Sequence, residues 1–100
     1  MILYNVTINI APEVHDEWLL WMKTVHIPEV LGTGLFTEGK IMRVLTTEAG
    51  EGHTYSIQYL LDTMEHYREY EQRFAKELQR VHTERYRDKF VAFRSLLESV

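Results

Sequence analysis

The chain of 100 residues contains no cysteine, so it has neither the material for a disulfide framework nor a thiolate nucleophile. It also lacks any run of 18 apolar residues, which a membrane-spanning helix would need. Its first residues carry no basic flank and no apolar signal core. These absences predict a cytoplasmic protein that does not bind membranes.

Positive charge is in short supply, since 11 Lys and Arg residues face 15 Asp and Glu residues and the net charge is -4. Binding to phosphate backbones needs clustered positive charge, so nucleic acid is not expected as a partner. The five histidines are not spaced as in metal-binding motifs, and neither His-Glu-x-x-His nor Cys-x-x-Cys occurs. We therefore expect no metal and no other cofactor.

What is present is the composition of one folded domain over residues 1–100, with 45% hydrophobic and 26% charged residues. Residues 1–10 alternate with period two. One side of this segment is apolar (Ile2, Tyr4, Val6, Ile8, Ile10) and the other is mostly polar (Leu3, Asn5, Thr7, Asn9). This pattern predicts a strand whose apolar face is covered by helices and whose other face meets something less apolar.

A helix is predicted from Pro12 to about Val25, and Ile27-Pro28 is expected to end or kink it. Its apolar stripe would consist of Val14, Trp18, Trp21, Met22 and Val25. After a loop at residues 32–34, a second strand is predicted from Leu35 to about Thr47. A glycine-containing turn at 48–52 would join it to a third strand over 55–59, giving a hairpin.

A second helix is predicted from Met64 to about Arg85, capped by Asp62 or Thr63. Its buried stripe would consist of Tyr67, Tyr70, Phe74, Leu78 and Val81. The segment from Lys89 to Leu97 is rich in Phe, Val and Leu and is interpreted as a closing strand, although Ala92, Leu96 and Leu97 would also suit a helix.

The predicted order is strand, helix, strand, strand, helix, strand, which is the split βαββαβ arrangement of the ferredoxin-like fold. This α+β fold has a four-stranded antiparallel sheet with two helices on one face. The other face would carry polar residues (Asn5, Thr7, Asn9, Arg43, Ser56, Gln58) and apolar ones (Leu3, Ile41, Leu45, Leu60). Such a mixed face is best covered by a second copy of the sheet, so we expect a homodimer.

A family resemblance rests on four segments: residues 26–31 (HIPEVL), 33–36 (TGLF), 55–59 (YSIQY) and 82–94, which begins HTER and ends KFVAFR. In these segments the chain resembles a small bacterial family known only as a domain of unknown function. That family is similar to the dimeric α+β barrel superfamily, with its cofactor-free antibiotic-biosynthesis monooxygenases, haem-degrading monooxygenases and lactone isomerases. The resemblance implies a dimeric α+β barrel of two ferredoxin-like chains, but it implies no function, because members of the superfamily differ in chemistry.

Candidate catalytic residues are histidines at helical spacings. His15 and His26 are eleven positions apart, which places both at one margin of the first helix's apolar stripe. There they could carry protons at the lip of a pocket, or fill the edge of the core. His82 and Glu71 are also eleven positions apart, about 16 Å along one helix, so only a ligand or a partner chain could join them in one site.

Candidate ligand-binding residues are Trp18, Met22 and Tyr59, which could wall a flat aromatic molecule or pack into the core. Arg43 is predicted on the open face of the sheet, which becomes the inner side of the barrel when a second chain covers it. There its charge could hold an anionic ligand or a glutamate of the partner chain. Glu71 is the last of the candidate ligand-binding residues.

Three kinds of function are compatible with the sequence. The first is a homodimer of unassigned role that binds a small molecule. The second is a cofactor-free monooxygenase or isomerase that acts on a small aromatic compound. The third is a regulatory or protein-interaction module that presents Leu20, an apolar residue on the polar side of the first helix.

Overall fold

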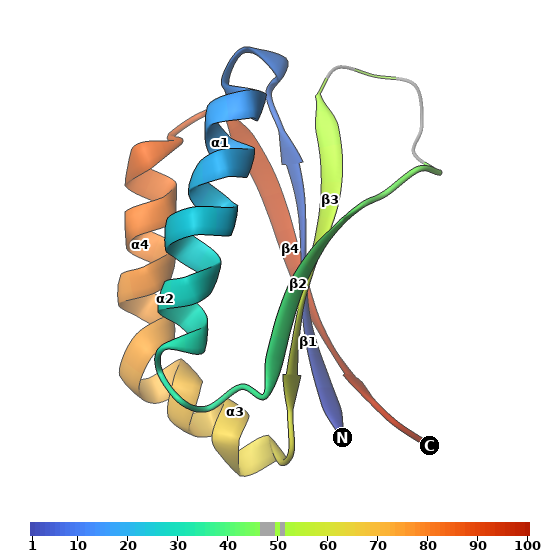
Figure 1. The fold of residues 1–100 in the computed structure, drawn as a ribbon, viewed down its shortest axis with the longest axis vertical. Helices are drawn as coiled ribbons and strands as arrows, with labels where there is room; N and C mark the ends of the chain where they lie inside the picture. Colours follow the sequence, from blue (N-terminus) through green and yellow to red (C-terminus); the bar gives the residue numbers. More distant parts are fainter. Residues whose placement is uncertain (47–49, 51) are drawn as a thin grey trace.

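The computed structural model describes residues 1–46, 50 and 52–100, and it shows helices along one face of a four-stranded antiparallel sheet (Figure 1). The strands are β1 (Ile2–Ile10), β2 (Glu38–Arg43), β3 (His53–Leu61) and β4 (Phe90–Glu98), in the order β2-β3-β1-β4. The helical segments are η1 (Pro12–Val14), α1 (His15–Trp21), η2 (Met22–His26), α2 (Ile27–Leu31), α3 (Met64–Tyr70), η3 (Glu71–Ala75) and α4 (Lys76–Arg85). The split βαββαβ arrangement and the α+β fold are thereby confirmed.

The strand pairing follows from the alternation in β1, whose residues are buried at every second position from Ile2 to Ile10. This strand lies in the middle of the sheet and pairs with both β3 and β4. The closing segment is a strand, as its Phe and Val content indicated. The hairpin of β2 and β3 is also confirmed, whereas Thr47 and residues 48, 49 and 51 of the predicted turn lie outside the described residues.

The second strand is shorter than predicted, and its side chains lie on the opposite faces of the sheet from those predicted. It begins at Glu38 instead of Leu35 and ends at Arg43. Ile41 pairs with Ile57 and Arg43 pairs with Tyr55, so both side chains lie on the face that β3 turns toward the helices. The prediction that Ile41 and Arg43 lie on the open face is wrong, because a register shift of one residue moves every side chain to the opposite face.

The first helix does not end near Val25. Helical backbone continues from His15 to Leu31 through α1, η2 and α2, and η2 is a π-helical segment. Pro28 has no N–H to donate, and it is accommodated in the first turn of α2, directly after this wider turn. The expected break at Ile27-Pro28 is therefore absent from the described helix.

Both long helices contain one π-helical segment, and each segment alters the buried stripe. In the first helix the buried position after Met22 is His26, while Val25 is 37% exposed. In the second helix η3 widens the stripe, since Ala75 and His82 are buried beside the predicted Phe74 and Val81, which are partly buried against the core. A π turn adds one residue to the helical repeat, so a stripe extrapolated at 3.6 residues per turn falls one position short.

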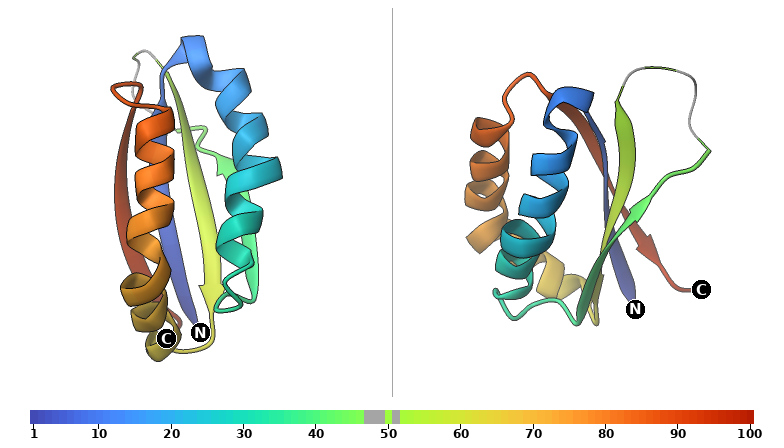
Figure 2. Two further views of the ribbon diagram at one scale, coloured as in Figure 1. Left: turned by 90° about the vertical axis from the view of Figure 1, so that its left-hand side faces the viewer. Right: turned by 45° about the horizontal axis from the view of Figure 1, so that its top comes forward.

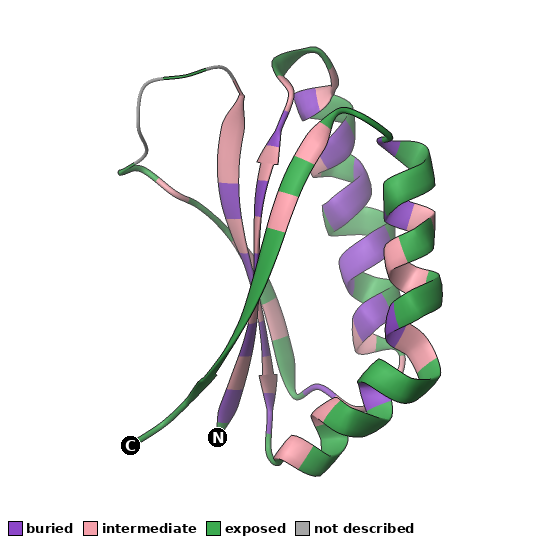
Figure 3. Cartoon of the chain, turned by 180° about the vertical axis from the view of Figure 1, so that it is seen from behind, coloured by how far each residue is buried: buried purple, intermediate pink, exposed green. Residues whose placement is uncertain are grey.

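The core lies between the sheet and two helical rods, one formed by α1, η2 and α2 and the other by α3, η3 and α4. The two rods run side by side across the sheet (Figure 2). Seen from behind, buried residues lie along the central strands and recur along the helices, and β4 is mostly exposed (Figure 3). Trp18 is fully buried, and Thr63 caps α3 by accepting a hydrogen bond from the backbone N–H of His66. Within the described residues, no helix has the length and apolar character needed to cross a membrane.

The shifted stripe can be tested with two matched substitutions on the same helical rod. Val30 is 1% exposed, so Val30→Ala should lower the free energy of unfolding by about 2 kcal/mol. Val25→Ala should change it by less than about 0.5 kcal/mol, because that side chain has left the buried stripe. Urea denaturation measures both, and equal losses would contradict the shift.

Candidate functional site

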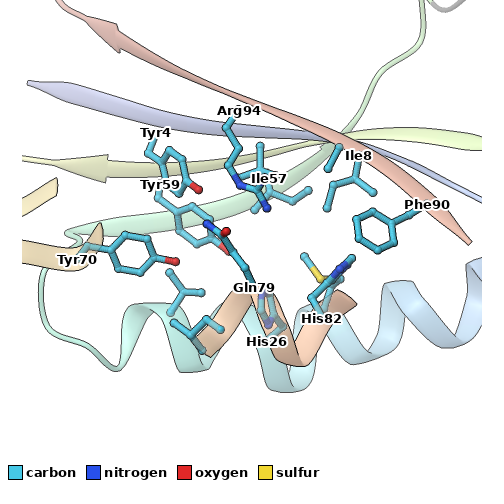
Figure 4. Close-up of a pocket in the computed structure, with 15 residues that line it drawn as sticks. Tyr4, Ile8, His26, Ile57, Tyr59, Tyr70, Gln79, His82, Phe90 and Arg94 are labelled. Atoms are coloured by element: carbon cyan, nitrogen blue, oxygen red, sulfur yellow. The ribbon is translucent and has the colours of Figure 1, made fainter. Parts of the chain in front are cut away.

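A cavity of about 40 Å³ lies between the helices and the sheet. The sheet contributes Tyr4, Tyr59 and Arg94 to its lining, and the helices contribute His26, Gln79 and His82 (Figure 4). The volume is enough for a few water molecules. The lining therefore combines aromatic walls with a small number of converging polar groups, which is the usual composition of a ligand site.

The two histidines of the cavity are brought together by the π segments. Their ring centroids lie 5.7 Å apart, and His26 also stacks on Trp21 at 4.9 Å. The indole Nε1 of Trp18 donates a hydrogen bond to Nε2 of His82 at 2.9 Å. Because Nε2 accepts, a neutral His82 carries its proton on Nδ1.

His26 differs from His82 in having a buried ring nitrogen, Nδ1, without a hydrogen-bond partner among the described residues. Burial lowers the pKa of His26 to about 4. Burial also lowers the pKa of His82 to about 4, with smaller contributions from His26 and Arg94. Both imidazoles are therefore neutral at pH 7, and each can donate or accept a hydrogen bond.

Tyrosine hydroxyls supply further donors. Burial raises the pKa of Tyr4, and the positive charge of Arg94 partly offsets this effect. Burial also raises the pKa values of Tyr59 and Tyr70. The pKa of Tyr67 is raised to about 12 by burial and by a hydrogen bond with Glu71. The phenols consequently stay protonated at neutral pH.

Arg94 is the formally charged residue of this cavity, and the sequence analysis did not identify it. It pairs with Val6 in the sheet register, which puts it on the helix-facing side of β4. A signal was available in the sequence, because Phe90, Ala92 and Arg94 alternate with period two and Arg94 interrupts an apolar row. Within the described part of the chain, Arg94 forms no salt bridge.

A second polar cluster is centred on Tyr55, which is buried and does not line the cavity. Nε2 of His15 lies 2.6 Å from the Tyr55 hydroxyl, and Nδ1 of His15 lies 2.9 Å from Asp16. Arg43 donates to the same hydroxyl at 2.9 Å. The charge of Arg43 is thus used to hold Tyr55 at the margin of the core.

The structure divides the predicted site residues into two groups. Four of them line the cavity, namely His26, His82, Met22 and Tyr59. The other four do not: His15 and Arg43 belong to the Tyr55 cluster, Trp18 is packed in the core, and Glu71 is exposed. His15 and His26 contact different partners, and Glu71 and His82 are not brought together. The described residues also contain no group of three His, Cys, Asp or Glu side chains placed to hold a metal ion.

The chain belongs to the family described as a domain of unknown function, DUF4286, whose model matches residues 1–100. No curated protein matches it. Its fold is similar to that of an ethyl tert-butyl ether D (EthD) family protein from Bacillus halodurans, with a TM-score of 0.68 at 11% identity over 100% of both chains.

Two further solved structures have the same fold. An antibiotic biosynthesis monooxygenase gives a TM-score of 0.64 at 11% identity, covering 100% of this chain and 99% of the other. A dimeric ferredoxin-like protein from an uncultured marine organism gives 0.64 at 17% identity, covering 99% and 95%. These similarities show a ferredoxin-like fold, and they leave the activity and the assembly open.

The low pKa values of His26 and His82 predict an acid-sensitive fold. As the pH falls from 6.5 toward 4, the unfolded chain takes up protons before the folded one, so stability that is present above pH 6.5 is lost. The loss should be on the order of 2 to 3 kcal/mol per histidine. Urea denaturation at steps of pH should therefore show a shallower pH dependence for His26→Gln and for His82→Gln. His66→Gln, at an exposed position on α3, serves as the control, and identical slopes in all three variants would refute the assignment.

Proposed function

We propose that the protein is a homodimer, formed through the open face of the sheet, that binds a small molecule in the cavity between helices and sheet. The observation that carries the proposal is this cavity, whose lining includes His26, a residue with a buried and unpartnered Nδ1. A buried polar atom without a hydrogen bond costs about 1 to 3 kcal/mol, and a ligand that pairs with it recovers that cost.

The polar centre of the open face supports a dimer because its groups already satisfy one another. Asn5 donates to Thr7 at 2.9 Å and accepts from Ser56. Gln58 donates to Ser56 at 3.1 Å, and Asn9 donates to Thr54 at 3.0 Å. A second sheet could cover this network while these hydrogen bonds stay formed, which lowers the desolvation cost.

Apolar side chains flank that polar centre. Val91, Phe93 and Leu97 of β4 are paired with open-face residues of β1, and they are 70%, 66% and 50% exposed. Met42 of β2, paired with Ser56, is 51% exposed. A second copy of the same face would cover these apolar side chains, because a two-fold symmetric interface brings the same patch of both chains together. The fold's similarity to a protein described as dimeric is consistent with this arrangement.

The dimer can be tested by light scattering coupled to gel filtration. The wild-type chain should elute with about twice the mass of one 11.9 kDa chain. Phe93→Asp should shift the protein to monomers, because it places an unpaired charge in the interface. Leu20→Asp changes a comparably exposed apolar residue on α1, and it should leave the dimer intact. A wild-type monomer at micromolar concentration would refute the dimer, and dissociation by Leu20→Asp would favour an interaction surface on the helices.

Binding can be tested by thermal denaturation in the presence of small phenols, heterocycles and carboxylic acids. A ligand at 100 times its Kd should stabilise the folded protein by about 2.7 kcal/mol and raise Tm. His26→Phe removes the unpartnered nitrogen and fills part of the cavity, so it should abolish the shift. His66→Phe, at an exposed position on α3, should preserve it. Equal shifts in both variants would place the ligand elsewhere, and no shift with any compound would count against binding.

A cofactor-free monooxygenase or isomerase acting on a small aromatic compound is the second candidate. The observation that favours it is again His26, because a neutral imidazole with a free nitrogen beside a cavity can act as a general base at pH 7. The protonated Tyr4 and Tyr70 hydroxyls would be the complementary donors. Consumption of a bound phenol, with or without oxygen uptake, distinguishes this enzyme from a simple binding protein.

A further inference from the structure

We infer that the ligand of this cavity carries a carboxylate that pairs with the guanidinium of Arg94. The inference rests on the proposed function and adds the chemical class of the ligand and the residue that selects it. Its basis is the position of Arg94, the chemistry of its neighbours and the absence of an acidic partner for it in the described residues.

The position of Arg94 is fixed by the strand that carries it. Because Val6 faces the helices, its β4 partner Arg94 does so as well. Figure 4 shows the side chain extending from β4 toward the helices, while Gln79 reaches toward the sheet from α4. Arg94 therefore lines the cavity near Tyr4, although the residue as a whole is exposed.

The cavity presents positive charge without a negative counterpart. In the described chain, no Asp or Glu lines it. The charge of Arg94 is felt by groups on the second long helix and on β1, since it lowers the pKa values of Tyr4, Tyr70 and His82. Glu71 lies outside the lining and raises the pKa values of Tyr4 and Tyr67. An anion in the cavity would therefore be attracted, and a cation would be repelled.

The donors around Arg94 suit a planar group that only accepts hydrogen bonds. A guanidinium offers two parallel N–H groups, which match the two oxygens of a carboxylate. The Tyr4 hydroxyl and the Gln79 amide can donate to the remaining lone pairs. An uncharged amide of the same shape would bring an NH2 group toward donors and lose the charge, so it should bind more weakly.

The size of the cavity limits the rest of the molecule. At about 40 Å³ it is well below the roughly 150 Å³ that accommodates benzene in an apolar protein cavity. Propionate and pyruvate are close to benzene in size, so the side chains of Arg94 and Gln79 must move aside for any of these acids, and a compact acid needs a smaller movement than an aromatic one. We accordingly assign the site to small monocarboxylates.

The test compares acids with their amides in titrations followed by NMR at pH 7. The probes are propionate and propionamide, pyruvate and pyruvamide, and benzoate and benzamide. The wild-type protein should bind the small acids at least 10-fold more tightly than their amides. Arg94→Gln should abolish that preference. Arg94→Lys keeps the charge but not the two parallel N–H groups, so it should retain part of the preference. Arg87→Gln, at an exposed position in the turn after α4, is the matched control and should keep the full preference.

The outcomes separate this inference from the proposed function. If amides bind as well as acids, or if Arg94→Gln keeps the preference, the carboxylate assignment is wrong while small-molecule binding in the cavity stands. If neither the acids nor the neutral compounds bind, both are wrong. Far-ultraviolet circular dichroism of Arg94→Gln and Arg94→Lys establishes that lost binding is not lost folding.

Discussion

The structure depends on the burial of one side of β1 beneath two helices. This central strand buries Ile2, Tyr4, Val6, Ile8 and Ile10, and it fixes the register of both neighbouring strands. Once the apolar side faces the helices, the alternate side must lie on the opposite surface of the sheet. The cavity and the open face are therefore two consequences of a single alternating segment, one on each side of the same strand.

The chemistry of the cavity depends on a second constraint, the π-helical turn in each helical rod. At η2 the inward position after Met22 is held by His26 and not by Val25, and beyond η3 His82 is buried beside the partly buried Val81. Both histidines thus face the sheet. Such irregular turns are frequent at functional sites, because they redirect a few side chains while the rest of the helix stays packed.

Much of the fold could be predicted from the sequence, because alternation in β1 and β3 and amphipathic stripes in the helices are strong periodic signals. The site could be predicted only in part. Tyr59 and Met22 follow from these periods, but the inward placement of His26 and His82 requires an extra residue in a helical turn, for which no periodic signal exists. Arg43 was misplaced because short β2 has too few residues to fix its register, and Arg94 was missed although the alternation in β4 marked it.

Both tryptophans contact histidines of the cavity, so their intrinsic fluorescence should report on its contents. Trp18 donates its indole N–H to His82, and Trp21 stacks on His26, so each indole touches one of the histidines of the cavity. Indole emission responds to the polarity and charge of its immediate surroundings. A molecule entering between helices and sheet, or a proton arriving on either imidazole, should therefore change the intrinsic fluorescence without any added label.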